Sequence, residues 1–471
     1  MFRPKATSEP TIDGRGHVDG AGGPTARRSQ VVKSGDKPAG LRQGGRVIDH
    51  SAAAPSRPAE PAANGGAPTL RVRALGPADL PDILELDQSA FGQDPPPGFL
   101  EELMVPWLEL DRFIGARDPA AGDLLVAQGC IYSKQMTFPG NRVQSVAGVS
   151  WVAVRAGWRR RGLLRGLMTT QLHELHTSGG EPVAILTASE AALYGRFGYG
   201  QAINRSSFSL LHGAAFRPGV AVEPVREIKA DTAPSIVKPL YARIAAGRPG
   251  NLARRDEVWA MRFSDHDFLR DGASKRKWAV HPDGFVTYRI KMEWNDRGPN
   301  STLILDEICA ATPVAFASLW RFVLDLELSR EITYRSGWVD DPLQDLLLDP
   351  RGLISKSRDH VWLRIVDLDR AIGLRAYSAP ARLVVDVRDE LCPWNAGRWL
   401  FEVDTGGGRV SRSTADPQVE LDISDLGACF VGGTPLGRLV TAGRVTGETE
   451  ALLQLGAALA TPVAPWCPEG F

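Results

Sequence analysis

The sequence predicts an α/β (α+β) protein. Two domains are expected in tandem, each with a mixed central sheet flanked by helices, followed by a smaller α+β domain at the end of the chain. Two observations support this prediction. Strand-like and amphipathic helical runs alternate in a similar order in residues 68–228 and again in residues 229–366. Residues 367–471 instead contain several short alternating strands and two helical runs, which is typical of a separate α+β domain.

Residues 1–67 predict a disordered tail. They are rich in Gly, Ala, Pro, Arg and Ser, and Phe2 is their only aromatic residue. Such a segment buries too little apolar surface to offset the entropy that it would lose on ordering. We expect a dispensable tail, with a partner-binding arm as the alternative, and a folded chain that begins near Leu70.

The elements of residues 68–228 follow from their hydrophobic periodicity. Apolar residues alternate in the first strand and recur every three to four residues in the two long helices, the second of which ends at Gly179. A continuous apolar run over 182–188 predicts a central strand buried on both faces. The predicted order is a strand over 69–75, a helix over 76–91 with Asp79 as its N-cap, strands over 123–138 and 144–154, a helix over 159–180, the central strand, and a short helix within 189–200.

Residues 229–366 repeat this order in the helix over 233–246, strands over 277–282, 284–292 and 301–310, a helix over 313–326, a strand over 331–336 and a helical segment over 341–348. The second stretch has Ala-Ala-Thr-Pro at a strand-to-helix junction where the first has three arginines and a glycine. If the two stretches share a fold, only the first can hold a phosphate-bearing ligand. The final domain is predicted to have strands over 381–389, 397–404, 407–413 and 419–424 and helices over 425–433 and 449–461.

Charge and cysteine usage exclude several classes of function. The chain has 55 acidic and 55 basic residues and a net charge of zero, which gives no reason to expect nucleic acid or an anionic membrane surface as a partner. No apolar run approaches the roughly 20 residues of a membrane span. The five cysteines are widely separated and form no C-x-x-C pair, so we expect neither disulfides nor a metal site. The first residues lack the apolar core of a signal peptide, and a cytoplasmic location is expected.

The most informative stretch joins the strand Val152-Ala153-Val154 to the helix that follows it. Arg159, Arg160, Arg161 and Gly162 stand at the junction. The first turn of a helix has unpaired N–H groups and the positive end of the helix dipole, glycine permits close approach of the backbone, and arginines pair with phosphate oxygens. The pattern predicts a pyrophosphate site, with the preceding strand binding an extended amide chain such as pantetheine. A solvated charge run is the alternative for the arginines considered alone.

Tyr194 follows the central strand and a short helix. When a thioester acylates an amine, the departing thiolate needs a proton. A tyrosine with a pKa of about 10 can supply it if the hydroxyl lies within hydrogen-bond reach. The alternative is a core aromatic residue, which we expect for the neighbouring Phe197 and Tyr199.

The segments 146–168 and 186–200, the second with Ala-Ser-Glu followed by Tyr-Gly-Arg-Phe-Gly-Tyr-Gly, resemble the enhanced intracellular survival (Eis) proteins. These are a branch of the GNAT superfamily of N-acetyltransferases. The resemblance extends from about Leu70 to Phe471 and includes a sterol-carrier-like final domain. The general pattern Q/R-x-x-G-x-G/A is matched at Arg159 and Gly162 but broken at Leu164, as is common in this branch.

The resemblance implies tandem GNAT-like domains and an acetyl-CoA-dependent N-acetyltransferase. It implies that Tyr194 is the general acid and that the C-terminal carboxylate of Phe471 is the general base. The implied cofactor-binding residues are Val152, Ala153, Val154, Arg159, Arg160, Arg161, Gly162, Leu163, Leu164, Arg165, Ser189 and Glu190. A carboxylate with a pKa of about 3.5 is a weak base in water, but desolvation next to an ammonium makes it more effective. The prolines near the C-terminus limit the freedom of the tail.

The resemblance also implies a primary amine acceptor on a polycationic small molecule, such as an aminoglycoside or polyamine, or on a lysine side chain, and a homohexamer. Asp94, Trp107 and Glu109 are candidates for an amine pocket by composition alone. Two alternatives remain: a lipid-binding or effector module with a vestigial acyltransferase domain, and an acyltransferase that uses a longer acyl donor.

Overall fold

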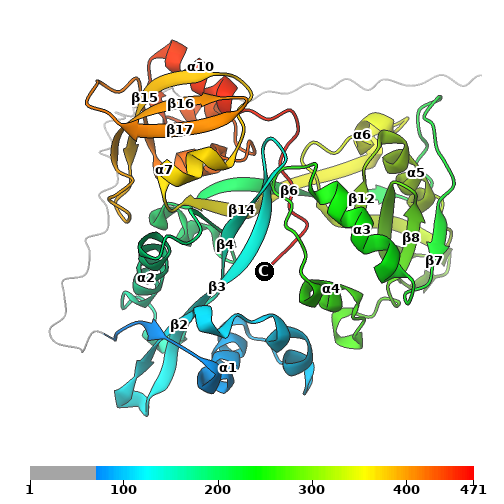
Figure 1. Cartoon of the computed structure of the whole chain (residues 1–471). Helices are drawn as coiled ribbons and strands as arrows, with labels where there is room; N and C mark the ends of the chain where they lie inside the picture. Colours follow the sequence, from blue (N-terminus) through cyan, green and yellow to red (C-terminus); the bar gives the residue numbers. More distant parts are fainter. Residues whose placement is uncertain (1–69) are drawn as a thin grey trace, which may run out of the picture. The chain divides into compact units, whose positions relative to one another are not determined.

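The computed structural model describes residues 70–471 (Figure 1). The tail predicted for residues 1–67 lies outside them. Over the described residues, a mixed sheet of 12 strands has the order β1-β2-β3-β4-β5-β14-β6-β13-β12-β9-β8-β7. Its strands are β1 Arg73–Ala74, β2 Phe113–Asp118, β3 Leu124–Phe138, β4 Arg142–Val154, β5 Val183–Thr187, β6 Gly200–Leu211, β7 Arg226–Ile228, β8 Lys277–His281, β9 Gly284–Lys291, β12 Ser301–Ala310, β13 Ser329–Gly337 and β14 Leu353–Ile365.

The two halves of this sheet repeat one structural unit. In each half, a long strand is followed by a helix and then by a strand parallel to the first: β4, α2 (Leu163–Thr177) and β5, and later β12, α5 (Pro313–Leu324) and β13. The remaining neighbours in the sheet are antiparallel. The prediction of tandem mixed sheets is therefore confirmed.

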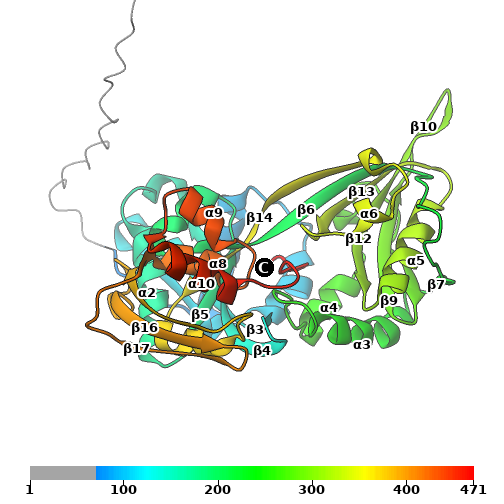
Figure 2. The same ribbon diagram turned by 90° about the horizontal axis from the view of Figure 1, so that it is seen from above.

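The strand β14 joins the two halves. It comes from the end of the second half, yet it lies between β5 and β6 and pairs with both. β6 in turn pairs with β13 of the second half. Figure 2 shows the long strands β6 and β14 running side by side from one half of the sheet into the other. The first half thus completes its sheet with a strand encoded more than 150 residues downstream of β5, as the residue ranges show.

The helices have apolar faces that pack on the sheet. In α2, for example, Leu167, Met168 and Leu172 are fully buried, as their 3.6-residue spacing predicts. The helices are α1 Leu80–Phe91, α2, α3 Ala233–Ala245, α4 Asp256–Phe263, α5, α6 Leu343–Leu346, α7 Leu368–Ala371, α8 Ile423–Cys429, α9 Leu436–Thr441 and α10 Thr449–Leu459.

The C-terminal domain has a sheet of five strands in the order β17-β16-β15-β18-β19. The strands are β15 Ala381–Arg388, β16 Gly397–Asp404, β17 Gly407–Arg412, β18 Val419–Asp422 and β19 Thr446–Gly447. Its core is continuous with the first half of the large sheet, because Phe138 of β3 and Leu363 of β14 belong to the same buried cluster as Phe401 and Phe430. Arg364 of β14 and Asp389, both buried, form an ion pair of 2.8 Å across this junction.

Several local predictions need correction. The first strand is only two residues long, and the segment 341–348 forms a single helical turn, α6. Asp79 is the N-cap residue of α1, as predicted, but its carboxylate accepts from the Gly76 amide at 3.0 Å and makes no hydrogen bond to the first turn of the helix. β6, β14 and α9 were not predicted. A short ribbon, β10 (Trp294–Asn295) with β11 (Gly298–Pro299), was also missed.

The five cysteines are all free and buried. Among residues 70–471, no helix combines the length and the apolar character that crossing a bilayer requires.

Candidate active site

The site begins where β4 and β5 separate. The two strands pair at only two positions, Ala147 with Ala184 and Gly148 with Ile185. The equivalent pair in the second half, β12 and β13, is joined over five positions. Beyond Gly148 the edge of β4 is therefore open, and a cavity of about 430 Å³ lies there. Part of its wall is formed by residues 149–152 of β4 and by residues 186–189, which are the end of β5 and the two residues after it.

A bulge shapes the open edge of β4. Trp151 has a φ of 54°, and the register between β3 and β4 shifts so that Trp151 and Val152 stand opposite the single residue Gly129. The indole N–H of Trp151 donates to the hydroxyl of Tyr132 at 2.6 Å, which holds the bulge. Beyond it, the carbonyl of Val154 accepts from Nε of Arg159 at 3.2 Å on the side away from β3. Because the N–H and C=O of one strand residue point the same way, the amide of Val154 also faces the open side.

The amino end of α2 lies next to this edge. Gly162 is the N-cap, has a φ of 83°, and provides no side chain to cap the helix. Arg160 also has a left-handed φ, 62°. At the equivalent place in the second half, the Thr312 hydroxyl accepts from the Ala315 amide at 3.2 Å and Pro313 lacks an N–H group. The first turn of α2 therefore keeps its N–H groups for an external anion, whereas α5 does not.

The arginines of the loop surround this helix end. The exposed residues are Arg159, Arg160, Arg161, Gly162 and Arg165, while Leu163 is buried and Leu164 is half-buried under them. The guanidinium of Arg161 lies 5.9 Å from the ring centroid of Trp158. None of these residues lines the 430 Å³ cavity, which is bordered by Val152 and Ser189 among the predicted cofactor residues. Ala153 is buried, and the exposed Glu190 is the N-cap of a short helix over 191–193.

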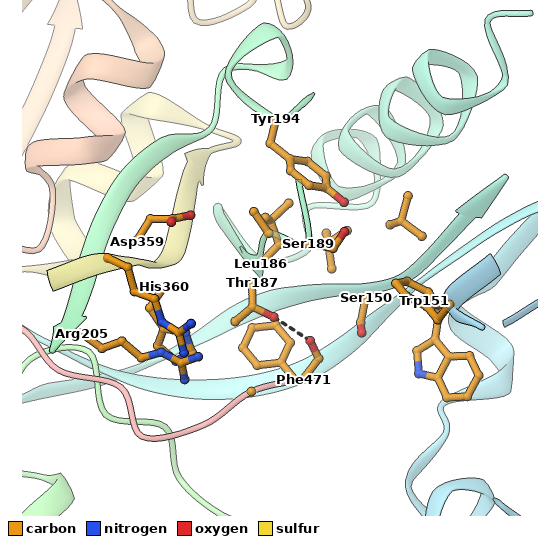
Figure 3. Close-up of a pocket in the computed structure, with 16 residues that line it drawn as sticks. Ser150, Trp151, Leu186, Thr187, Ser189, Tyr194, Arg205, Asp359, His360 and Phe471 are labelled. Carbon is orange, nitrogen blue, oxygen red and sulfur yellow. Dashed lines mark hydrogen bonds between the residues drawn. The ribbon is translucent and has the colours of Figure 1, made fainter. Parts of the chain in front are cut away.

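Tyr194 lines the cavity and is 6% exposed. It lies between two short helical turns, Ala191–Leu193 and Gly195–Phe197, which present its side chain to the cavity (Figure 3). Its ring packs edge-on against Tyr199, with centroids 6.1 Å apart. Burial raises the pKa of Tyr194, and the negative charge of Glu190 raises it further. The phenol is therefore protonated at neutral pH and can donate a proton. Phe197 and Tyr199 are core residues, as predicted.

The C-terminal residue, Phe471, reaches the same cavity. One of its terminal oxygens accepts from the hydroxyl of Thr187 at 3.0 Å, at the end of β5 (Figure 3). Its ring lies 5.2 Å from Nζ of Lys134, a buried lysine that also lies 4.8 Å from the ring of Tyr132. A Cβ on Gly148 would lie 3.3 Å from the Phe471 ring, so glycine at this position allows the ring to approach β4.

Buried charges hold the tail that delivers Phe471. The carboxylate of Glu469 pairs with Nε of Arg254 at 2.6 Å and with Arg262 at 3.1 Å, and Arg262 also pairs with Glu307 of β12 at 3.3 Å. Burial alone would raise the pKa of Glu469, but the two arginines outweigh it and hold the pKa at about 2. The second half of the sheet thus fixes a residue two positions before the C-terminus.

Two further contacts complete this attachment. The indole N–H of Trp466 donates to the carbonyl of Ser336 at 2.7 Å, and the His360 ring is 2.7 Å from the Glu469 carbonyl. In Figure 1 the tail runs from the C-terminal domain to a chain end beside β3 and β4. No local sequence pattern points to Thr187, Lys134, Arg254 or Glu469, because their importance depends on where the tail lies.

The residues proposed by composition for an amine pocket do not line the cavity. Glu109 is engaged by the amide of Ser133 at 3.0 Å and by Arg255 at 3.0 Å, and Asp94 is exposed. Trp107 is buried and stacks on Tyr132 with centroids 5.5 Å apart. Within the part of the chain that the structure describes, no three His, Cys, Asp or Glu side chains are grouped so that they could hold a metal ion.

Comparison with protein families agrees with this geometry. Residues 71–202 match a family model described as an acetyltransferase (GNAT) domain, and residues 250–365 match a second model of the same description. Residues 368–468 match a sterol carrier protein domain.

Similar proteins cover most of the chain. An uncharacterized N-acetyltransferase of Streptomyces coelicolor is 37% identical over 397 residues, which cover 81% of this chain and 95% of the relative. The N-acetyltransferase Eis of Mycobacterium tuberculosis is 30% identical over 365 residues, covering 75% of this chain and 88% of the relative. The crystal structure of Eis1 from Mycobacterium abscessus superposes with a TM-score of 0.75 at 30% identity, covering 85% of this chain and 100% of that chain.

Proposed function

The chain belongs to the Eis-like N-acetyltransferases of the GNAT superfamily, and from that membership we propose that it transfers the acetyl group of acetyl-CoA to a primary amine. The observation that carries the proposal is that Tyr194 and the terminal residue Phe471 line one cavity at the open edge of β4. A proton donor and a proton acceptor thus flank the place where a thioester would lie.

The proposed acetyl-CoA site uses two features that the second half of the sheet lacks. The open edge of β4, with the amide of Val154 facing outward, suits the amide-bearing pantetheine arm. The uncapped amino end of α2 at Gly162, with Arg160, Arg161 and Arg165 around it, suits the pyrophosphate. Ser189 borders the cavity and is proposed to contact the same ligand, with Glu190 next to it.

The proposed chemistry moves two protons. The amine nitrogen attacks the thioester carbon, and the carboxylate of Phe471 accepts the proton that the nitrogen loses. The C–S bond then breaks, and the hydroxyl of Tyr194 protonates the departing thiolate. The buried phenol has a raised pKa and stays protonated, while the Thr187 hydroxyl orients the carboxylate.

The acceptor is proposed to be a primary amine of a polycationic small molecule, such as an aminoglycoside or polyamine, or of a lysine-like compound. We further propose a homohexamer in the cytoplasm, which light scattering on the purified protein and fractionation of cells would test. These proposals rest on membership of the family.

An acetyl-CoA thiol-release assay over aminoglycosides, polyamines and lysine tests the function. Mass spectrometry of the products would locate the modified nitrogen. We expect amine-dependent thiol release and a mass gain of one acetyl group for at least one class. Thiol release that does not depend on any amine would contradict the proposal.

A further inference from the structure

One wall of the cavity is basic. Arg205 on β6 and Arg358 on β14 both line the cavity, next to His360. The two arginines are direct partners in the antiparallel ladder between these strands. Arg335 lies on β13, the other neighbour of β6, and is exposed. Burial lowers the pKa of Arg205, the charges of Arg358 and Arg335 lower it further, and the charge of Asp359 raises it.

This arrangement is unfavourable without a ligand. Like charges that face each other across two strands destabilise a sheet. Nε of Arg205 is also buried with no hydrogen-bond partner, which carries a desolvation cost. Arg364 on the same β14 is paired with Asp389, whereas no carboxylate of residues 70–471 lies within ion-pair distance of Arg205 or Arg358. An anion between the two guanidinium groups would relieve both costs.

The neighbouring side chains offset the charge of this wall only in part. Asp359 also borders the cavity, and its carboxylate accepts from the indole N–H of Trp362 at 2.8 Å; its negative charge acts on Arg205 without forming an ion pair with it. Burial and the charges of Arg205 and Arg358 lower the pKa of His360 to about 4, so its ring is neutral at physiological pH. The positive charge of the wall therefore comes from the two arginines, and the single carboxylate of Asp359 balances only one of them.

The cavity also has a negative pole. Figure 3 shows Arg205 and His360 on one side of Phe471, with Ser150 and Trp151 on the other. The terminal carboxylate of Phe471, held by Thr187, thus lies in the same cavity as the arginine wall. A molecule with an amine at one end and an anionic group at the other matches both poles. A molecule with positive charges alone matches only one and is repelled by the other.

We propose that the acceptor carries an anionic oxygen group, a carboxylate or a phosphate, which binds between Arg205 and Arg358 while its amine faces the carboxylate of Phe471. The guanidinium group of arginine suits either anion, because its fork of N–H donors pairs with two oxygens at once. This inference rests on the proposed acetyl transfer and narrows its acceptor class. It favours a lysine-like compound over a polyamine or an aminoglycoside whose charges are all positive.

Matched pairs of amines test the inference. Lysine and cadaverine differ by a carboxylate, and phosphoethanolamine and ethanolamine differ by a phosphate. We expect kcat/KM to be roughly tenfold or more higher for the anionic member of at least one pair, since a hydrogen bond to a charged group is worth about 1.5–3 kcal/mol. The pair that shows the preference identifies the anion.

Variants connect the preference to the wall. Arg205→Met and Arg358→Met should each remove most of the preference, because kcat/KM should fall far more for the anionic member of the pair than for the member without the anion. Arg226→Met is the control, because Arg226 is exposed on β7 at the far edge of the sheet. If Arg205→Met does not fold, Arg358→Met, at an exposed position, tests the same ratio of kcat/KM between the two members of each pair.

Equal or better turnover of cadaverine and ethanolamine by the wild-type protein would overturn the inference, as would an unchanged preference in both arginine variants. If no amine is acetylated, the proposed function fails. Binding of 6-aminohexanoate and of hexylamine, measured by calorimetry, then tests the anion site, because this measurement needs no turnover. Selective binding of 6-aminohexanoate that Arg358→Met abolishes would support the site, and equal binding of the two would overturn it.

Discussion

The hydroxyl of Thr187 donates a hydrogen bond of 3.0 Å to the terminal carboxylate of Phe471, which joins the end of β5 to the end of the chain across 284 residues. This contact places a free carboxylate beside the open edge of β4 and in the same cavity as Tyr194.

Removing Phe471, or amidating it, is expected to lower kcat by about 10²–10⁴-fold, the usual contribution of a positioned general base. Steady-state kinetics at saturating acetyl-CoA measures this. Phe471→Leu is the matched control, because it keeps the terminal carboxylate and changes only the ring and its contacts, such as the one with Lys134. Wild-type turnover by the shortened chain would show that another group is the base.

Tyr194→Phe should lower kcat by about 10²-fold or more while the protein stays folded, because it removes only the hydroxyl. Tyr199→Phe is the control: the Tyr199 hydroxyl is buried without a hydrogen-bond partner, so its removal should leave both activity and stability almost unchanged. Since burial raises the pKa of Tyr194, its deprotonation should reduce kcat only above about pH 10, the ordinary pKa of a tyrosine. Full activity of Tyr194→Phe would assign the proton to water or to another side chain.

Arg160→Ala combined with Arg161→Ala should raise KM for acetyl-CoA by roughly 10–100-fold, because two charge-assisted contacts to phosphate are lost. The value of kcat should change little. The effect should shrink at high salt, since screening already weakens exposed charges. Arg330→Ala, another exposed arginine, serves as the control. Unchanged binding of the donor, measured by calorimetry, would remove the pyrophosphate assignment.

Glu469→Gln should destabilise the fold by about 3 kcal/mol, because it leaves Arg254 with one of its two buried carboxylate partners missing. It should also lower kcat, since the tail that carries Phe471 loses its anchor. If this loss acts through Phe471, the substitution should have no further effect on kcat in the chain that lacks Phe471. An additive loss in the double variant would show that the effect is unrelated to the terminal carboxylate.

The same residue predicts an acid transition. The pKa of Glu469 is lowered from 4.5 to about 2 in the folded protein, so the stability that it contributes is complete above pH 4.5 and is lost as the pH falls toward 2. Thermal unfolding of the wild-type protein and of Glu469→Gln over this range should therefore converge at low pH. A constant difference between the two would assign the stabilisation to contacts other than the charge.

The sequence predicts the parts of this fold that depend on local patterns. The helix α2 and the strand β5 were found because the leucines of one recur at helical spacing and the other is a continuous apolar run. The Arg159 to Gly162 turn was identified because its residue types suit an anion; that Arg160 and Gly162 have left-handed φ values was not predicted.

What the sequence did not predict depends on contacts between distant residues. Nothing in the alternation of β14 indicates that it inserts between β5 and β6, because strand pairing over such a separation leaves no local pattern. The opposition of Arg205 and Arg358 follows from that insertion and was missed for the same reason. The anchoring of Glu469 was missed because it requires knowing which buried arginines the tail meets.

The position of β14 and of Phe471 has a consequence for biosynthesis. When the first half of the chain has emerged from the ribosome, β14, the strand that separates β5 from β6, has not yet been synthesised. The carboxylate of Phe471 becomes free only when the finished polypeptide is released from the transfer RNA. A nascent or prematurely terminated polypeptide would therefore lack the base that we propose for the reaction. If Phe471 is the base that we propose, residues appended after it, such as an affinity tag, would convert its carboxylate into a peptide bond and should lower activity.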